Sequence, residues 1–186
     1  QAGGDGQIRV GIGARQAIFH TAALWAGIRY AQADGAIFFA PNVNSFRRFL
    51  PDTSAPVNVE WGEENRTVGL RVPEANPQNR RVENRLPGAD ANPYLVLAAS
   101  LLCGYMGMVE GINPSAPVKG RGYERRNLRL PVTIEHALER MENCKEGVKY
   151  LGENFMRGYV AVKRAEHENY KRVISSWERE FLLSSV

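Results

Sequence analysis

A short segment in the middle of the chain places arginine and glutamate at a spacing that suits phosphate chemistry. Arg81, Glu83 and Arg85 recur at every second residue, so a strand would present all of them on one face. A strand just before them could add Arg71 to the same sheet face. Arginine forks neutralise phosphate oxygens, and a glutamate carboxylate can hold a hard divalent cation. The pattern therefore permits a phosphate and metal site, although cross-strand ion pairs on a solvated strand face are the commoner reason for such a run.

Two other arginines precede these strands. Arg48 belongs to a stretch, 40–56, that contains prolines at positions 41, 51 and 56. This predicts an ordered loop rather than a helix or a central strand, and such a loop can hold an arginine for substrate binding. Taken alone, however, Arg48 is better explained as a surface residue. Arg66 can face the same way as Arg71 only if it lies in the loop before the strand, because an odd spacing sends strand residues to opposite faces.

The other residues that commonly bind metals show no comparable pattern. His20, His136 and His167 lack metal-ligand spacing, and we expect each of them to be a surface or packing residue. Cys103 and Cys144 form no CxxC pair, which fits a reducing cytosol better than a disulfide scaffold. A divalent cation would therefore have to rely on carboxylates.

The first half of the chain is predicted to contain a loop, a helix and two strands. Residues 1–13 are rich in glycine and predict a loop, while the apolar spacing over 15–33 predicts a helix. Apolar residues alternate with polar ones over 67–72 and again over 81–86, which predicts two strands joined by a polar loop. These two strands are the elements that must position the arginines.

The second half is predicted to be mostly helical after residue 90. Asn92 is a good helix cap, and a strongly apolar helix is expected from Tyr94 to about Val109. It falls short of the roughly 20 apolar residues of a membrane span, so we expect a buried core helix and no membrane partner. After a basic loop at 117–129, Thr133 is expected to cap the next helix.

The net charge of +4 and the pI of about 9.2 allow either nucleic acid or small phosphorylated molecules as partners. A basic nucleic-acid-binding module spreads its arginines along a surface, usually with exposed aromatic residues. Here the arginines gather in three short motifs around one carboxylate, which favours compact phosphates over nucleic acid. The chain begins at Gln1 without a signal-peptide pattern, so we expect a fragment or processed product of a cytoplasmic protein.

Three sequence blocks resemble the C-terminal half of the glutamine synthetase catalytic domain. They are NVNSFRRFLP (42–51), APVNVEWGEENRTVGLRVP (55–73) and RRVENRLPGADANPYL (80–95), in the family's order and with compatible spacing. The resemblance extends from about Ala40 to Gly111 and more loosely to Val186. It implies an α+β fold of antiparallel strands packed with helices. It also implies that residues 1–186 are part of a catalytic domain, without its first half and without the family's N-terminal β-domain.

The resemblance implies an ATP-dependent carbon–nitrogen ligase. In such enzymes glutamate attacks the γ-phosphate of ATP to give γ-glutamyl phosphate, and an amine then displaces phosphate. Arg48 resembles the arginine that engages glutamate, and Arg85 resembles the one that grips its α-carboxylate. Arg66 resembles the arginine that steadies the transferred phosphoryl group, so Arg48 and Arg66 are the candidate catalytic residues.

The same resemblance implies ATP and Mg²⁺ or Mn²⁺ as cofactors. Arg71 and Arg81 resemble the arginines that, with Arg66, bind the ATP phosphates, and Glu83 resembles a ligand of the bridging metal. Family members form their sites between neighbouring subunits of a ring and use the β-domain to do so. We therefore expect a ring-shaped homo-oligomer at full length, and no activity from this chain alone.

Ser54 departs from the pattern of the ammonia-using synthetases, which have a glutamate at this position. A negative charge suited to ammonium is missing there. The surrounding motifs are closest in wording to the γ-glutamylputrescine, or γ-glutamylpolyamine, synthetase branch, which uses larger amines. The resemblance thus favours a γ-glutamylpolyamine synthetase-like ligase, with an ordinary ammonia-using glutamine synthetase as the alternative.

Overall fold

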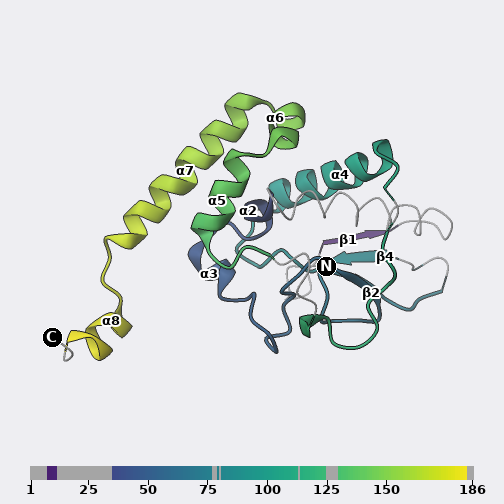
Figure 1. The fold of residues 1–186 in the computed structure, drawn as a ribbon, viewed down its shortest axis with the longest axis horizontal. Coiled ribbons are helices and arrows are strands. Elements are labelled where there is room, and N and C mark those ends of the chain that lie inside the picture. Colours follow the sequence, from purple (N-terminus) through teal and green to yellow (C-terminus); the bar gives the residue numbers. More distant parts are fainter. Residues whose placement is uncertain are drawn as a thin grey trace.

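The computed structural model describes residues 8–11, 35–76, 79, 81–112, 114–124 and 130–183. In chain order the elements are β1 (Ile8–Gly11), α2 (Ala36–Phe39), α3 (Val43–Phe46), β2 (Trp61–Glu63), β3 (Leu70–Val72), β4 (Arg81–Asn84), α4 (Pro93–Val109), the 3₁₀ turn η2 (Gly122–Glu124), α5 (Ile134–Glu142), α6 (Lys145–Leu151), α7 (Glu153–Lys171) and α8 (Ser176–Phe181). Figure 1 shows the strands on one side of the molecule and α5 to α7 on the other. The predicted α+β fold is confirmed, as is the helical second half.

The described strands form one four-stranded sheet in the order β1-β4-β3-β2. β4 runs antiparallel to both β1 and β3, as expected for the two predicted strands, whereas β2 joins β3 in parallel. The pairing of β3 with β4 sets Arg71 directly opposite Glu83. Both predicted strands are shorter than expected: β3 retains Arg71 and β4 retains Arg81 and Glu83, whereas Arg85 lies just beyond the end of β4.

The predicted loop at 1–13 is corrected, because residues 8–11 form the strand β1. Its backbone pairs with β4 from Ile8 opposite Asn84 to Gly11 opposite Arg81. The free edge of β4 presents backbone donors and acceptors that need partners, and a short run with two β-branched residues supplies them. The flanking glycines concealed this run in the sequence. The helix predicted at 15–33 and residue His20 lie outside the described residues.

The predicted loop at 40–56 is also corrected in part, because it contains the one-turn helix α3. The hydroxyl of Ser45 accepts a hydrogen bond from the backbone N–H of Asn42 at 3.0 Å, which closes the first turn. Pro41 precedes this turn and Pro51 follows it, so neither proline interrupts the helical hydrogen bonds. The rest of the segment is irregular, as predicted.

The helix boundaries predicted in the second half are confirmed. The Asn92 side chain accepts hydrogen bonds from the backbone N–H groups of Tyr94 and Leu95, at 3.0 and 3.3 Å, and α4 ends at Val109. The Thr133 hydroxyl caps α5 in the same way. No helix in the described part of the chain is long and apolar enough to cross a membrane.

The core fixes the sheet against the helices. Phe39, Leu70, Leu86 and Leu138 are essentially inaccessible to solvent, and burying each such side chain contributes roughly 1.5–3 kcal/mol. Asn84 of β4 connects the two layers, because its amide nitrogen donates to the Ser100 hydroxyl of α4 at 3.2 Å. This contact leaves the neighbouring Glu83 on the opposite face of the strand.

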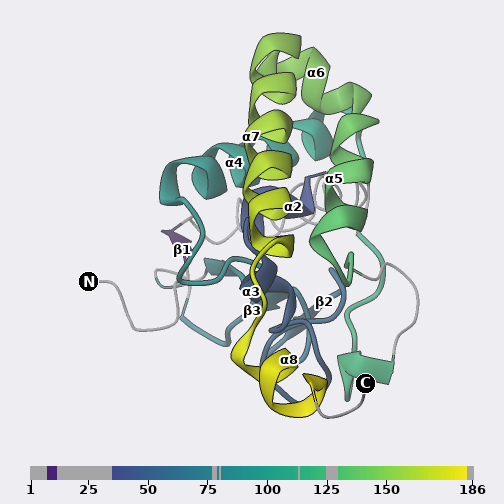
Figure 2. The ribbon, with the colours of Figure 1, turned by 90° about the vertical axis from the view of Figure 1, so that its left-hand side faces the viewer.

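The helices α5, α6 and α7 form the other part of the molecule. α7 packs against both α5 and α6, and α2 packs between α4 and α5. Figures 1 and 2 both show α8 standing apart from the other helices at the C-terminal end. Cys103 and Cys144 are both buried, and no disulfide joins them.

Candidate active site

Glu83 lies at the centre of the candidate site and is completely buried. Its Oε2 accepts a hydrogen bond from Arg71 Nη1 at 2.8 Å, across the β3–β4 pair. Its Oε1 lies 3.2 Å from Arg81 Nη2 and 3.3 Å from Arg81 Nε. A solvated strand face would expose this carboxylate, so the solvated-face explanation does not fit. The part of the predicted grouping that sets Arg71 and Arg81 around Glu83 is therefore present in the structure.

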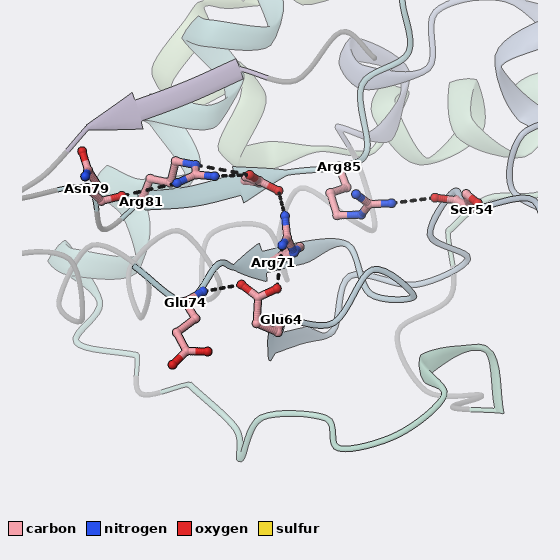
Figure 3. Close-up of polar contacts among 8 residues, drawn as sticks. Ser54, Glu64, Arg71, Glu74, Asn79, Arg81 and Arg85 are labelled. Atoms are coloured by element: carbon pink, nitrogen blue, oxygen red, sulfur yellow. Dashed lines mark hydrogen bonds and ion pairs between the residues drawn. The ribbon is translucent and has the colours of Figure 1, made fainter. Parts of the chain in front are cut away.

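Arg71 is shared between two carboxylates. Its Nη2 lies 2.7 Å from Glu64 Oε2, while its Nη1 binds Glu83, and Figure 3 shows Arg71 reaching the Glu64 carboxylate. The other oxygen of Glu64 accepts the backbone N–H of Glu74. The hydrogen bond from Arg71 lowers the pKa of Glu64, and the bond from the Glu74 backbone acts in the same direction. Glu64 therefore stays ionised beside Arg71 at neutral pH.

Glu64 could not be identified as a site residue from the sequence pattern. The residue follows β2, which pairs in parallel with β3 and so brings the end of one strand beside Arg71 on the other. β2 has three residues and was not predicted, because a strand this short carries no periodicity. The acidic pair at Glu63 and Glu64, directly before the Arg66 motif, was the only available indication.

Arg85 continues the strand face beyond β4 and reaches the proline-rich loop. Its Nη2 donates to the backbone carbonyl of Ser54 at 2.6 Å, a contact that is drawn in Figure 3. Its Nε is buried and has no hydrogen-bond partner among the described residues. Burial lowers the pKa of the Arg85 guanidinium, and the nearby Glu83 acts in the opposite direction. Arg85 remains a cation with donor capacity left for a carboxylate.

Arg48 lies against the turn that follows β4. Its guanidinium donates to the carbonyls of Leu86 and Pro87, at 3.2 and 3.4 Å. The loop that carries it is tied to the same turn, because the Ser45 hydroxyl donates to Asp90 at 2.5 Å. Burial lowers the pKa of Arg48, with Asp90 acting against this. The structure thus places Arg48 beside the chain segment that immediately follows Arg85.

Arg66 is exposed and lies in the turn before β3, which is the placement that allows it to share a side with Arg71. Its positive charge is close enough to contribute to lowering the pKa of both Glu64 and Arg85. Asn65 fixes this turn, since its amide donates to the carbonyls of Val118 and Gly120 at 3.0 and 2.8 Å. Sequence reasoning did not single out Asn65 as the residue that holds the turn.

Ser54 is exposed in a loop with unusual backbone geometry. Its φ is 63°, and that of Asp52 is 66°, so two non-glycine residues adopt the left-handed conformation. Such residues persist where surrounding contacts hold them, and they are often found at functional sites. Here the contacts are the Arg85 bond to the Ser54 carbonyl and an ion pair between Asp52 and Arg121.

A divalent cation fits Glu83 only as part of a larger ligand set. A carboxylate offers about four lone-pair directions, and the arginine contacts occupy about three of them. No group of three histidine, cysteine or acidic side chains that could hold a metal occurs in the described part of the chain. Of the histidines, His136 is exposed beside Arg140, and His167 is buried and lies 2.6 Å from Glu135, as expected for surface and packing residues.

The chain from residue 17 to residue 182 matches the family described as glutamine synthetase, catalytic domain. The chain belongs to the glutamine synthetase catalytic-domain family. This confirms the family resemblance, whose three sequence blocks carry all the arginines of the candidate site and Glu83.

Individual members of the glutamine synthetase family show the same relationship. A γ-glutamylputrescine synthetase of Escherichia coli (strain K12) is 38% identical over 165 residues, which cover 87% of this chain and 34% of that protein. A γ-glutamylethanolamide synthetase of Streptomyces coelicolor is 33% identical over 82% of the chain and 33% of its own length. A type-1 glutamine synthetase of Dictyostelium discoideum is 33% identical over 80% of the chain and 29% of its own length. The chain therefore spans about a third of the length of these relatives.

Proposed function

We propose that the whole protein containing this chain is an ATP-dependent ligase that forms γ-glutamyl phosphate and passes the γ-glutamyl group to an amine larger than ammonia. The observation that carries the proposal is the buried Glu83 carboxylate between Arg71 and Arg81, with Arg85 and Arg66 beside it. Several cations around one carboxylate match what phosphoryl transfer needs, namely neutralisation of charge and fixed positioning. Family membership supports the same class of reaction.

In the proposed reaction, the arginines divide between ATP and glutamate. Arg71 and Arg81 bind phosphate oxygens of ATP, and the exposed Arg66 follows the phosphoryl group as it is transferred. A γ-carboxylate oxygen of glutamate forms a bond to the γ-phosphorus, and the bond to the leaving ADP oxygen breaks. A divalent cation bound in part by Glu83 would supply further neutralisation of the phosphate charge.

Glutamate itself is held by Arg85 and Arg48. The free donor capacity of Arg85 suits the α-carboxylate, because a guanidinium can form two parallel hydrogen bonds to a carboxylate. In the second step the amine nitrogen attacks the γ-carbonyl carbon, the amide bond forms and phosphate leaves. The attacking nitrogen then loses a proton, which gives the neutral amide.

The choice of amine rests on the loop at Ser54. A serine offers no negative charge to attract ammonium or to accept its proton, and its small side chain leaves room for a longer amine. The loop is bound directly to Arg85, so the amine position and the glutamate position are adjacent. Two of the relatives described above are named as synthetases of γ-glutamylputrescine and γ-glutamylethanolamide, which supports an amine substrate larger than ammonia. The third relative is a glutamine synthetase, and this keeps ammonia as the alternative.

The proposal is tested by phosphate release from the full-length enzyme with putrescine, ethanolamine or ammonium, at saturating ATP and glutamate. We expect a higher kcat/KM for a primary amine than for ammonium, and we expect Ser54→Glu to shift this ratio toward ammonium. Ser54→Gln is the matched control, because it adds similar bulk without charge. A wild-type enzyme that prefers ammonium would make the protein an ordinary glutamine synthetase.

The alternative of a basic nucleic-acid-binding module is no longer needed to explain the clustered arginines, because the chain belongs to a family of ligases.

The remaining parts of the site are proposed to come from the rest of the protein. The chain spans about a third of its relatives, and Glu83 offers room for only part of a metal site. We therefore propose that residues 1–186 are part of a catalytic domain. Further metal ligands and the contacts that build a ring-shaped homo-oligomer would then lie in sequence outside this chain.

A further inference from the structure

Glu64 makes a contact that no step of the proposed reaction uses. Its Oε2 lies 2.7 Å from Arg71 Nη2, on the side of the guanidinium opposite the Glu83 contact at Arg71 Nη1. Arg71 Nε is buried and has no hydrogen-bond partner among the described residues. The two carboxylates therefore hold the Arg71 guanidinium from two directions, as Figure 3 shows on the Glu64 side.

The backbone at Glu64 is held in a conformation that glutamate seldom adopts. Its φ of 48° lies in the left-handed region, which costs an ordinary side chain energy. Two contacts fix it there: its N–H donates to the Val72 carbonyl at 3.0 Å, and its carboxylate accepts the N–H of Glu74. The first contact locks the backbone to β3 and the second orients the side chain. The result is a glutamate aimed at Arg71.

We propose that Glu64 is a positioning residue, which holds Arg71 in place for the phosphates of a nucleotide. This inference rests on the proposed function, in which Arg71 binds phosphate and Glu83 contributes to a metal site. The Glu83 carboxylate cannot use both of its oxygens to bind a metal cation and still hold Arg71 as firmly. Glu64 provides the second anchor, so Arg71 keeps its position when Glu83 is engaged elsewhere.

The distribution of exposure supports this division of roles. The Glu83 side chain is 1% exposed and the Glu64 side chain is 47% exposed, while Arg71 between them is 12% exposed. A carboxylate at the surface can remain hydrated on its outer side while it holds the arginine. It therefore anchors Arg71 without the large desolvation cost that a second buried carboxylate would bring.

The test uses the full-length protein with Glu64→Gln, and Glu63→Gln serves as the matched control. Glu63 is exposed, and its side chain makes no ion pair within the described part of the chain. The first readout is the Kd of the non-hydrolysable analogue adenylyl imidodiphosphate in the presence of Mg²⁺, which requires no turnover. The second is the set of KM values for ATP and glutamate together with kcat. We expect Glu64→Gln to weaken analogue binding and raise the ATP KM by roughly three- to tenfold, with the glutamate KM unchanged.

A second variant separates positioning from folding. Glu64→Asn also removes the charge, but asparagine tolerates a positive φ better than glutamate. We expect it to unfold at nearly the wild-type urea concentration and still to show the weaker nucleotide binding. Equal nucleotide affinity in both Glu64 variants and in wild type would overturn the inference. A parallel loss of nucleotide affinity, glutamate affinity and kcat would also overturn it, because it would indicate a purely structural role.

The outcomes also distinguish this inference from the proposed function. A wild-type protein that binds the analogue but ligates no amine would refute the proposed function alone, and the Glu64 comparison would still decide the positioning role. A wild-type protein that binds no nucleotide would refute both, since Arg71 would then have no phosphate to serve.

Discussion

Replacing Glu83 by glutamine measures how far the fold depends on the buried carboxylate. The substitution keeps the shape of the side chain but removes its charge, which leaves Arg71 and Arg81 facing a neutral amide at distances of 2.8 and 3.2 Å. Removing one partner of a buried ion pair typically costs about 3–5 kcal/mol. Arg71 retains Glu64, and the Arg81 side chain is 25% exposed, so water compensates part of the loss. We therefore expect a value near the lower limit, about 3 kcal/mol.

The assay is urea unfolding of the chain, followed by circular dichroism. A loss of about 3 kcal/mol should also lower Tm by roughly 6–12 °C for a chain of this size. Glu63→Gln is the control, because it removes an exposed charge from β2, which lies in the same sheet but does not pair with β4. In a double-mutant cycle, the variant that also carries Arg81→Met should regain part of the lost free energy of unfolding, because it no longer has an unpaired cation at Arg81. A loss below about 1 kcal/mol would refute this reasoning. It would mean that the ion pairs of Glu83 add little to the free energy of unfolding, because the cost of burying the carboxylate offsets them.

Three further predictions concern separate parts of the molecule. In the full-length enzyme, Arg85→Ala should raise the glutamate KM by roughly 10- to 150-fold, because a charge-assisted hydrogen bond to glutamate is lost, while the ATP KM changes little. An unchanged glutamate KM in a folded variant would show that Arg85 has only a structural role. The chain by itself should release no ADP in a glutamate-dependent manner and should bind Mg²⁺ or Mn²⁺ only weakly by calorimetry, and measurable turnover would contradict this. Burial raises the pKa of Cys103 to about 12, so its thiol should resist iodoacetamide at pH 8 in the folded chain and react in urea; rapid labelling of the folded chain would show that this helix opens readily.

The grouping around Glu83 could be predicted from the sequence because it depends on local rules. The two-residue spacing fixes which side chains share a face of β4, and a short connection makes β3 the natural neighbour. Arg71 and Glu83 could therefore lie on the same sheet face if both strands formed, and the structure pairs them directly. The cap at Asn92 was predictable for the same reason, because it depends only on adjacent residues.

Glu64 and β1 could not be predicted because both depend on non-local pairing. The parallel strand β2 has only three residues, which is too short to show an alternating pattern in the sequence. The positive φ that directs Glu64 toward Arg71 occurs at a glutamate, whereas glycine or asparagine would have indicated such a turn. β1 exists through its pairing with the edge of β4, about seventy positions further along the chain. The roles given to Ser54, to Glu83 and to the five arginines of the candidate site all stay predictions, since geometry alone does not assign them.

The bond from Arg85 to the Ser54 carbonyl has a consequence for how the two substrates influence each other. A carboxylate that binds Arg85 competes with the Ser54 carbonyl, which accepts a hydrogen bond from Arg85 Nη2 at 2.6 Å. Such competition changes how firmly the loop with its left-handed residues is held. Thermodynamic linkage makes any such influence reciprocal: if glutamate changes the affinity of the loop for an amine by some factor, the amine changes the affinity for glutamate by the same factor. One hydrogen bond to a backbone oxygen would thus be enough to make the two binding events interdependent.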